Sequence, residues 1–158
     1  MLIRQYTPAD RLQCIDIFNS NCPTYLDPSE INGLENWLNG LDKGEIVYKN
    51  SAADFFYVVE HNNTVIACGG FYIVKDKQQA NMTWGMVNNL CHKQGYGKQL
   101  FQYRVIQIKK LFPTHSIVLD TSQHTYPFFE RFGFTVTNII PNAYGPGLDR
   151  YDMINTGQ

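Results

Sequence analysis

The residues whose types and spacing could do chemistry lie in the stretch "VNNLCHKQGYGKQLFQ", from Val87 to Gln102. Gly95 and Gly97 flank one tyrosine between a strand-like run and a helix-like run. A helix N-terminus leaves about four backbone N–H groups unpaired and carries the positive end of the helix dipole, so it attracts anions. Glycines there have no Cβ and let a phosphate approach those groups. The stretch predicts either a phosphate-binding turn or an ordinary glycine-rich turn.

Two common phosphate-binding motifs do not fit this stretch. A P-loop requires Ser or Thr after Gly-Lys, whereas Gly97-Lys98 is followed by Gln99. The dinucleotide fingerprint requires a small residue where Leu100 stands, and it begins directly after a strand. Here seven residues separate the end of the strand-like run from the first glycine. Neither motif therefore assigns the stretch.

The elements before this stretch are predicted from hydrophobic periodicity, with a period of two for strands and of 3.6 for helices. Two glycine positions inside the predicted strands, Gly69-Gly70 and Gly85, indicate bulges or a close approach of the backbone. The predicted strands span residues 2–7, 55–60, 65–74 and 79–87, and the predicted helices span 11–21 and 27–41. The last three strands therefore form an antiparallel meander.

The elements after the stretch begin with a helix over 97–112, whose predicted apolar stripe is Leu100, Phe101, Val105, Ile108 and Leu111. A strand over 116–120 follows, and strand, helix and strand in succession predict a parallel crossover. A short helix over 125–133 and two strands, 134–140 and 149–154, around a loop over 141–148 complete the chain. The predicted fold class is α/β (α+β), with a mixed central sheet of six to seven strands and about four helices.

Length, composition and charge limit the classes of function. A chain of 158 residues is expected to form a single domain, 1–158. A net charge of −1, with no basic run longer than Lys109-Lys110, argues against a nucleic-acid partner. No apolar run reaches the ~20 residues of a membrane-spanning helix, and the N-terminus does not resemble a signal peptide. The four cysteines show no metal-binding or redox spacing, so we expect free thiols, no metal and a cytoplasmic location.

The same stretch resembles the acetyl-CoA motif of the GNAT acetyltransferase superfamily. In that motif a Val ends a strand, a Pro or polar residue follows, and Arg or Gln-x-x-Gly-x-Gly/Ala opens a helix. Val87, Asn89, His92, Gly95 and Gly97 stand at these positions in order, with His92 in place of the first basic residue. The resemblance implies that Gly95 and Gly97 belong to a pyrophosphate site.

A second run, "FFERFGF" (128–134), resembles the superfamily's signature of two aromatics, Glu, a basic residue, any residue, Gly and Phe. With the matching order of elements, the resemblance covers nearly the whole chain. It implies a GNAT-like fold and a single N-acetyltransferase domain. The implied reaction transfers an acetyl group from the cosubstrate acetyl-CoA to a primary amine of a small molecule or protein, by direct attack in a ternary complex.

The resemblance also implies how acetyl-CoA is held. Backbone groups at the end of the strand over 79–87 would pair with the amides of the pantetheine arm, as an added strand does. The N–H groups of residues 94–98 would bind the pyrophosphate. The implied cofactor-binding residues are Met86, Val87, Asn88, His92, Gln94, Gly95, Tyr96, Gly97, Lys98, Ser122 and Phe129.

The general acid is left open by the sequence. Many relatives carry a Tyr at the second aromatic of the signature, where this chain has Phe129. Tyr126 lies one helical turn earlier and can face the same way. Ser122 and Tyr144 are further candidates for a catalytic hydroxyl. Phe129 also favours an alternative, a non-catalytic acyl-CoA-binding or regulatory domain of the same fold.

The general base and the acceptor are equally open. The segment 79–91 contains no acidic residue, so water, Asp120, His124 or Tyr144 would take the proton. Segments 25–45 and 141–152 are implied to form the acceptor wall. The acidic residues of the first segment either favour a cationic amine or form a solvated helix face; they are Asp27, Glu30, Glu35 and Asp42. A monomer or a homodimer is expected.

Overall fold

The computed structural model describes residues 1–156, and its strands form one seven-stranded sheet in the order β1-β2-β3-β4-β5-β7-β6. The β4/β5 pair is parallel and the other neighbouring pairs are antiparallel, which confirms the predicted mixed sheet. The strands are β1 (Leu2–Gln5), β2 (Ser51–His61), β3 (Thr64–Val74), β4 (Gln79–Val87), β5 (Ser116–Thr121), β6 (Thr135–Gly145) and β7 (Leu148–Asn155). The helices are α1 (Arg11–Ser20), α2 (Ile31–Lys43), α3 (Tyr96–Leu111) and α4 (Tyr126–Glu130).

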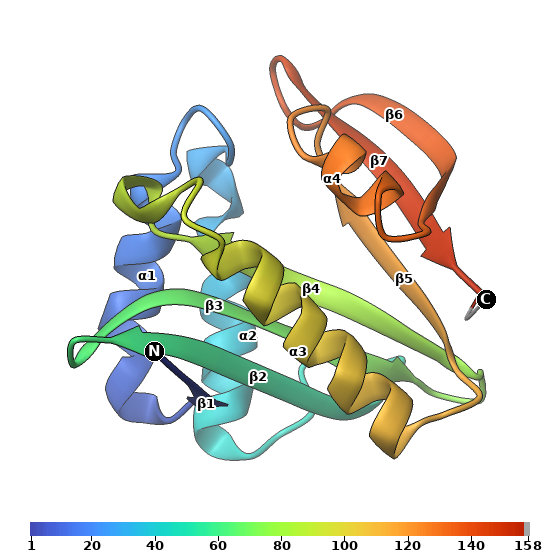
Figure 1. Ribbon diagram of the computed structural model, residues 1–158, viewed down its shortest axis with the longest axis horizontal. Helices are drawn as coiled ribbons and strands as arrows, with labels where there is room; N and C mark the ends of the chain where they lie inside the picture. The colour runs from blue at the N-terminus through green and yellow to red at the C-terminus, as the bar shows by residue number, and fades with distance from the viewer. Residues whose placement is uncertain (157–158) are drawn as a thin grey trace.

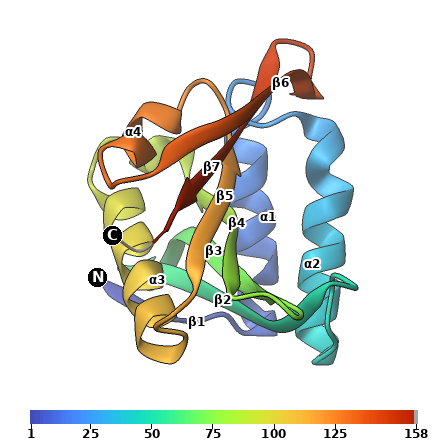
Figure 2. The same ribbon diagram turned by 90° about the vertical axis from the view of Figure 1, so that its right-hand side faces the viewer.

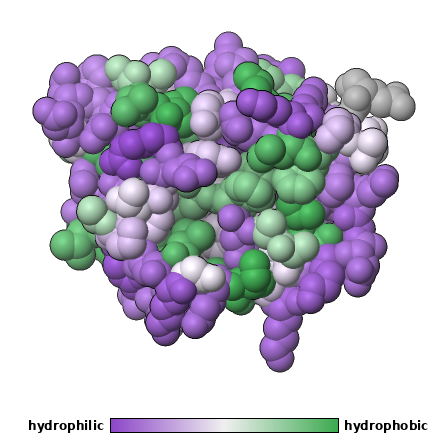
Figure 3. Space-filling view, turned by 90° about the horizontal axis from the view of Figure 1, so that it is seen from below, coloured by the Kyte–Doolittle hydropathy of each residue, from purple (hydrophilic) through white to green (hydrophobic). Residues whose placement is uncertain are grey.

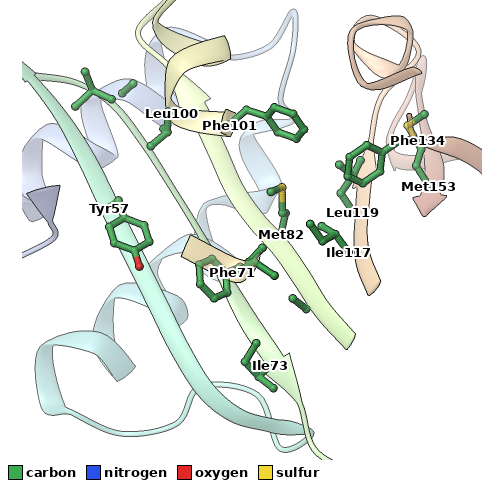
Figure 4. Packing of buried hydrophobic residues seen from close by; sticks show 14 of the residues in the cluster. Tyr57, Phe71, Ile73, Met82, Leu100, Phe101, Ile117, Leu119, Phe134 and Met153 are labelled. Atoms are coloured by element: carbon green, nitrogen blue, oxygen red, sulfur yellow. The ribbon is translucent and has the colours of Figure 1, made fainter. Parts of the chain in front are cut away.

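Helices cover both faces of the sheet, with α1 and α2 on one face and α3 and α4 on the other (Figures 1 and 2). Strand alternation supplies an apolar surface to each layer. In β2, Tyr57 and Val59 pack with the α3 layer, whereas Phe56 and Val58 pack with the α1/α2 layer. Figure 4 shows the cluster on the α3 side, including Phe71, which is fully buried.

Several predicted boundaries were wrong, and the largest differences are at the start of β2 and in the last hairpin. β2 begins at Ser51 rather than at residue 55, because Ser51 and Asp54 pair with Val74 and Tyr72 of β3. Ser51 Oγ also donates to the Asp54 carboxylate at 2.7 Å. β6 continues through most of the predicted loop over 141–148, as far as Gly145. An edge strand tolerates Pro141, which the sequence pattern assigned to a loop.

The buried face of α3 also differs from the predicted stripe. Leu100, Phe101 and Ile108 are buried as expected, but Leu111 is 48% exposed. Arg104, which the stripe omitted, is only 5% exposed. It stands midway between Leu100 and Ile108 on one row of the helix, so the helical geometry places it toward the sheet.

The surface includes exposed apolar residues, and two of them lie on the edge strand β6. Seen from below, apolar side chains form a band between polar ones (Figure 3). The edge strand β6 carries Ile139 and Ile140, which are 48% and 40% exposed. An edge strand offers unpaired backbone groups to another chain, and the expected monomer or homodimer stays a prediction. Among residues 1–156, no helix is long and apolar enough to cross a membrane.

Asp10 joins β1 to the start of α1 through a partly buried ion pair, in which the Arg4 side chain is 30% exposed and that of Asp10 is 5% exposed. Both Arg4 Nη atoms donate to the Asp10 carboxylate at 2.9 Å, and the Thr7 N–H donates to it at 2.8 Å. The Arg4 guanidinium holds the pKa of Asp10 below its ordinary value. This stability is therefore present above the unfolded pKa of about 4 and is lost as pH falls through the lower folded pKa.

We expect Asp10→Asn to lower the free energy of unfolding by about 2 kcal/mol at neutral pH, because Arg4 loses its nearer counter-charge and keeps only Glu60 at 3.6 Å. Urea unfolding at several pH values measures the change. The variant should also lose part of the wild-type decline in stability below about pH 4. Asp16→Asn, on the exposed face of α1, is the control and should leave both quantities almost unchanged. Equal stability of Asp10→Asn and wild type at neutral pH would contradict this assignment.

Candidate functional site

The candidate site is a gap between β4 and β5. These strands pair only where residues 79–81 meet residues 116–118. Beyond these residues β4 continues to Val87 and β5 to Thr121, but the two strands do not pair with each other there. Their ribbons diverge toward these ends (Figure 1). In Figure 4, Met82 of β4 and Leu119 of β5 lie between the diverging strands. The two parallel strands therefore separate in a V at their C-terminal ends, and this separation is called the gap below.

A bulge in β4 accompanies the opening. Cys68 of β3 pairs with Met86, and Gly70 pairs with Thr83, so Trp84 and Gly85 together stand opposite Gly69. Trp84 has a φ of 53°, the left-handed conformation that a non-glycine residue rarely adopts in a strand. A bulge of this kind bends the strand that carries it. The bulge predicted at Gly85 is confirmed.

The guanidinium of Arg104 lies directly against this bulge. A Cβ on Gly85 would stand 2.9 Å from Arg104 Nη2, and a Cβ on Gly69 would stand 3.0 Å from Arg104 Cζ. Arg104 Nη1 donates to the Gly70 carbonyl oxygen at 3.1 Å. The close backbone approach predicted for these glycines is therefore an approach to a buried arginine.

The end of β4 is held by side chains of α1 and of the following loop. The Val87 carbonyl oxygen accepts a hydrogen bond from Asn21 Nδ2 at 2.9 Å and lies 3.0 Å from His92 Nε2. The Asn88 N–H donates to Ile66 of β3 at 2.8 Å. The backbone N–H and C=O groups of successive residues alternate in direction along a strand. Because those of Asn88 point toward β3, the N–H and C=O groups of Val87 point away from β3 and toward the gap.

The first turn of α3 stands beside the end of β4. Gly95, at the N-cap, has a φ of 89°, which favours glycine. The Gln99 N–H donates to the Gly95 carbonyl at 3.1 Å, so the N–H groups of Tyr96, Gly97 and Lys98 precede the first helical bond. A Cβ on Gly97 would stand 3.3 Å from Val87 Cγ2. Unpaired N–H groups and a side-chain-free approach thus coincide at the mouth of the gap.

Aromatic side chains connect the loops around the mouth. Tyr25, from the segment between α1 and α2, lies between His92 and His124, with ring centroids 5.1 and 5.7 Å apart. His92 follows β4 and His124 follows β5, so Tyr25 contacts both sides of the opening. Lys98 Nζ lies 6.0 Å from the Phe132 ring, on the side of α3 that faces the α4 turn. Gln94 is exposed.

The hydroxyl candidates near α4 occupy separate places. Ser122, at the end of β5, is buried, and its Oγ accepts the His124 N–H at 3.2 Å. Tyr126 stacks on Tyr151 of β7, with centroids 4.4 Å apart and an angle of 13°. Phe129 packs against Phe101, with centroids 5.3 Å apart, within the α3/α4 core. Phe129 therefore supplies packing here and no proton.

Tyr144 lies next to Asp120 of β5. Its hydroxyl donates to the Asp120 carboxylate, which joins the end of β6 to the end of β5. Burial and the negative charge of Asp120 raise the pKa of Tyr144 above its ordinary value. The phenol therefore stays protonated at neutral pH and is unsuited to act as the base.

Part of the acidic segment faces the same place. Burial raises the pKa of Glu30, and the charges of Asp27 and Asp120 raise it further. The hairpin end of β6 lies against Asp27, since a Cβ on Gly145 would stand 2.6 Å from Asp27 Oδ1. Asp42 lies elsewhere, where it accepts from Tyr6 and pairs with Arg11 at 3.0 Å. Two of the four acidic residues of this segment, Asp27 and Glu30, thus lie at this edge of the gap.

Two residues at the site were missed by sequence reasoning. Asn21 was taken only as the end of a helix, and nothing in its spacing pointed to Val87, which lies in a different element. The burial of Arg104 could have been predicted from two features of the sequence. It is four residues from both Leu100 and Ile108, and the strand glycines Gly69 and Gly85 leave room for its side chain. Within residues 1–156, no group of three or more His, Cys, Asp and Glu side chains could hold a metal ion.

Comparison with known proteins gives one family match and many structural matches. The sequence model of the acetyltransferase (GNAT) domain matches residues 52–136, more than half of the chain. This range contains the bulge, the first turn of α3 and α4. No curated protein matches the chain significantly.

Similar solved structures share the fold at low sequence identity. An N-acetyltransferase from Staphylococcus aureus is 14% identical, with a TM-score of 0.76, over 99% of this chain and 98% of that chain. A ribosomal-protein-alanine N-acetyltransferase from Brucella melitensis is 15% identical, with a TM-score of 0.72, over 99% of each chain. An aminoglycoside 6'-N-acetyltransferase complexed with coenzyme A is 16% identical, with a TM-score of 0.71, over 100% of this chain and 98% of that chain.

Proposed function

Because the chain belongs to the GNAT acetyltransferase family, we propose that it transfers the acetyl group of acetyl-CoA to a primary amine of a small molecule or protein. The observation that carries this proposal is the β4/β5 gap with the first turn of α3 at its mouth. A single domain in the cytoplasm, as a monomer or homodimer, completes the proposal.

The residues at the gap fit acetyl-CoA. The unpaired N–H groups of Tyr96, Gly97 and Lys98 suit a pyrophosphate. The Val87 N–H faces the gap where an extended arm would pair, whereas the Val87 carbonyl oxygen already accepts from Asn21 Nδ2. Met86, Asn88, His92, Gln94, Gly95, Ser122 and Phe129 complete the proposed binding set by position or by packing. Bound acetyl-CoA supplies an activated thioester, and the protein supplies its orientation.

The edge of the gap formed by Glu30, Asp120 and Tyr144, called the acceptor edge below, fits a cationic amine. Glu30 and Asp120 place two carboxyl groups near Tyr144. Such carboxyl groups attract an ammonium group and can accept its proton directly or through water before it attacks. Glu30, whose pKa is raised by burial, joins Asp120 and His124 among the proposed bases.

We expect Asp120→Asn to raise KM for a cationic primary amine about tenfold, because the acceptor edge loses one negative charge and the Tyr144 hydroxyl is left with a neutral acceptor. The affinity for acetyl-CoA should change little. Steady-state kinetics with acetyl-CoA and with amine varied separately measure both. Glu130→Gln, on the exposed face of α4, is the control. An unchanged KM for amine in Asp120→Asn would remove Asp120 from the acceptor site.

The proposed function is tested by ligand-induced thermal stabilisation followed by thiol release. Acetyl-CoA should raise Tm, whereas adenosine and NAD should not. Free CoA thiol should then appear with some members of a panel of primary amines. No stabilisation at concentrations well above micromolar would contradict CoA binding and leave the stretch as an ordinary turn.

A second candidate function is a non-catalytic acyl-CoA-binding or regulatory domain, which Phe129 favours. Acetyl-CoA would then stabilise the chain without any thiol release. Tyr126→Phe adds information on the proposed acid: a fall in turnover with unchanged CoA affinity supports Tyr126. Its stacking on Tyr151 favours a packing role, for which turnover stays unchanged.

A further inference from the structure

Arg104 is a buried cation for which the site described so far gives no purpose. It is 5% exposed, and its one direct hydrogen bond among residues 1–156 goes to the carbonyl oxygen of Gly70. Its Nε atom is buried without a partner. Burying an unpaired charge costs several kcal/mol, so a fold tolerates it only where the charge is compensated or used.

The groups around Arg104 do not compensate its charge. The ionisable group that acts on it is Cys68 of β3. Hydrogen bonding to Cys14 and burial hold the pKa of the Cys68 thiol well above its ordinary value, so this thiol is neutral. The neighbouring strand β4 contains no acidic residue. Burial lowers the pKa of Arg104 to about 10, which still leaves the guanidinium charged at neutral pH.

The position of the charge connects it to the gap. Arg104 reaches up from α3 and contacts the bulge at Gly85, with 2.9 Å between Nη2 and the place of a Cβ. Gly85 is itself exposed, although Arg104 below it is not. The bulge is therefore a thin layer of backbone between the gap and a positive charge on the α3/α4 side.

We propose that Arg104 is a positioning residue that fixes the β4 bulge and places a positive charge beneath the sulfur of CoA. The inference rests on the proposed function, in which the thioester lies beside this end of β4. When the amine nitrogen bonds to the carbonyl carbon, the C–S bond breaks and its electron pair leaves on sulfur as a thiolate. The amine proton passes to water or to the acceptor-side base. A nearby cation stabilises the thiolate without donating a proton, which compensates for Phe129.

The test measures the ionisation of the CoA thiol itself. CoA without an acetyl group is bound to the protein and titrated with base, while ultraviolet absorbance follows the formation of its thiolate. In wild type the bound thiol should ionise at least about one pH unit below free CoA, a tenfold greater ionisation constant. Arg104→Met should bring the value back toward that of free CoA, and Arg104→Lys should keep part of the shift. Lys110→Met removes a charge from the exposed side of the same helix and should have no effect.

The outcomes separate this inference from the proposed function. CoA that binds wild type with an unshifted thiol pKa overturns the role of Arg104 and leaves the acetyltransferase proposal intact. Equal shifts in wild type and Arg104→Met have the same meaning. Failure of CoA to bind wild type overturns both proposals. Because wild type is compared with free CoA, the inference stays testable even if Arg104→Met does not fold.

Discussion

Replacing Gly97 with Trp is expected to abolish acetyl-CoA binding, with a rise in Kd of at least about 100-fold, or about 3 kcal/mol. A Cβ at this position already stands 3.3 Å from Val87 Cγ2. An indole ring must therefore either fill the mouth of the gap or push the first turn of α3 away from β4. Both outcomes remove the proposed pyrophosphate site, and isothermal titration calorimetry measures the loss.

The control for this prediction is Lys110→Trp, which places the same ring on the exposed last turn of α3. It should bind acetyl-CoA as wild type does. A cooperative thermal transition in both variants shows that each is folded. Wild-type affinity in Gly97→Trp would mean that acetyl-CoA does not use this turn.

Gly70→Ala is expected to have the largest effect on stability, a loss of about 3 kcal/mol or more in the free energy of unfolding. A Cβ on Gly70 would stand 2.0 Å from the Phe55 carbonyl oxygen, an atom of the neighbouring strand backbone. The methyl group would also stand 2.9 Å from Phe56 Cδ1. Because backbone cannot rotate aside, β2 and β3 must separate locally. Urea unfolding followed by circular dichroism measures the change.

Gly44→Ala is the matched control, because it tests backbone conformation without a clash. Gly44 has a φ of 68° and no atom within 4 Å of its Cβ position. Alanine in the left-handed conformation costs about 1 kcal/mol. A loss in Gly70→Ala no larger than that in Gly44→Ala would show that the strands adapt to the methyl group.

Periodicity predicted most of the sheet because its signal is local. The alternation in β2 and β3 reflects two packed faces, and the strand–helix–strand order before and after α3 allows only a parallel crossover. Periodicity missed the continuation of β6, because Pro141 and the glycines around it are typical of loops. An edge strand needs only one set of backbone partners, so it accepts residues that an inner strand excludes.

In the candidate site too, the part that depends on a local motif was predicted from the sequence, and the part that depends on distant contacts was not. The spacing from Val87 to Gly97 is local, and the family resemblance that it carries implied most of the proposed cofactor-binding residues. Ser122 and Phe129 lie outside this stretch. The acceptor edge depends on contacts between distant segments, such as Tyr144 with Asp120 and the hairpin end with Asp27. No local pattern encodes these contacts. Arg104 was missed for a different reason, because charged residues are rarely buried and the stripe was drawn from apolar residues alone.

The most direct test of acetyl transfer is the stoichiometry of its two products. Acetyl-CoA labelled with ¹³C in its acetyl group is incubated with the protein and a cationic primary amine, and both products are quantified by mass spectrometry. Acetyl transfer predicts equal amounts of free CoA and of amine carrying one labelled acetyl group, and neither product without protein. Free CoA without acetylated amine, or acetyl-CoA that binds but forms no product with any amine of a broad panel, would contradict it.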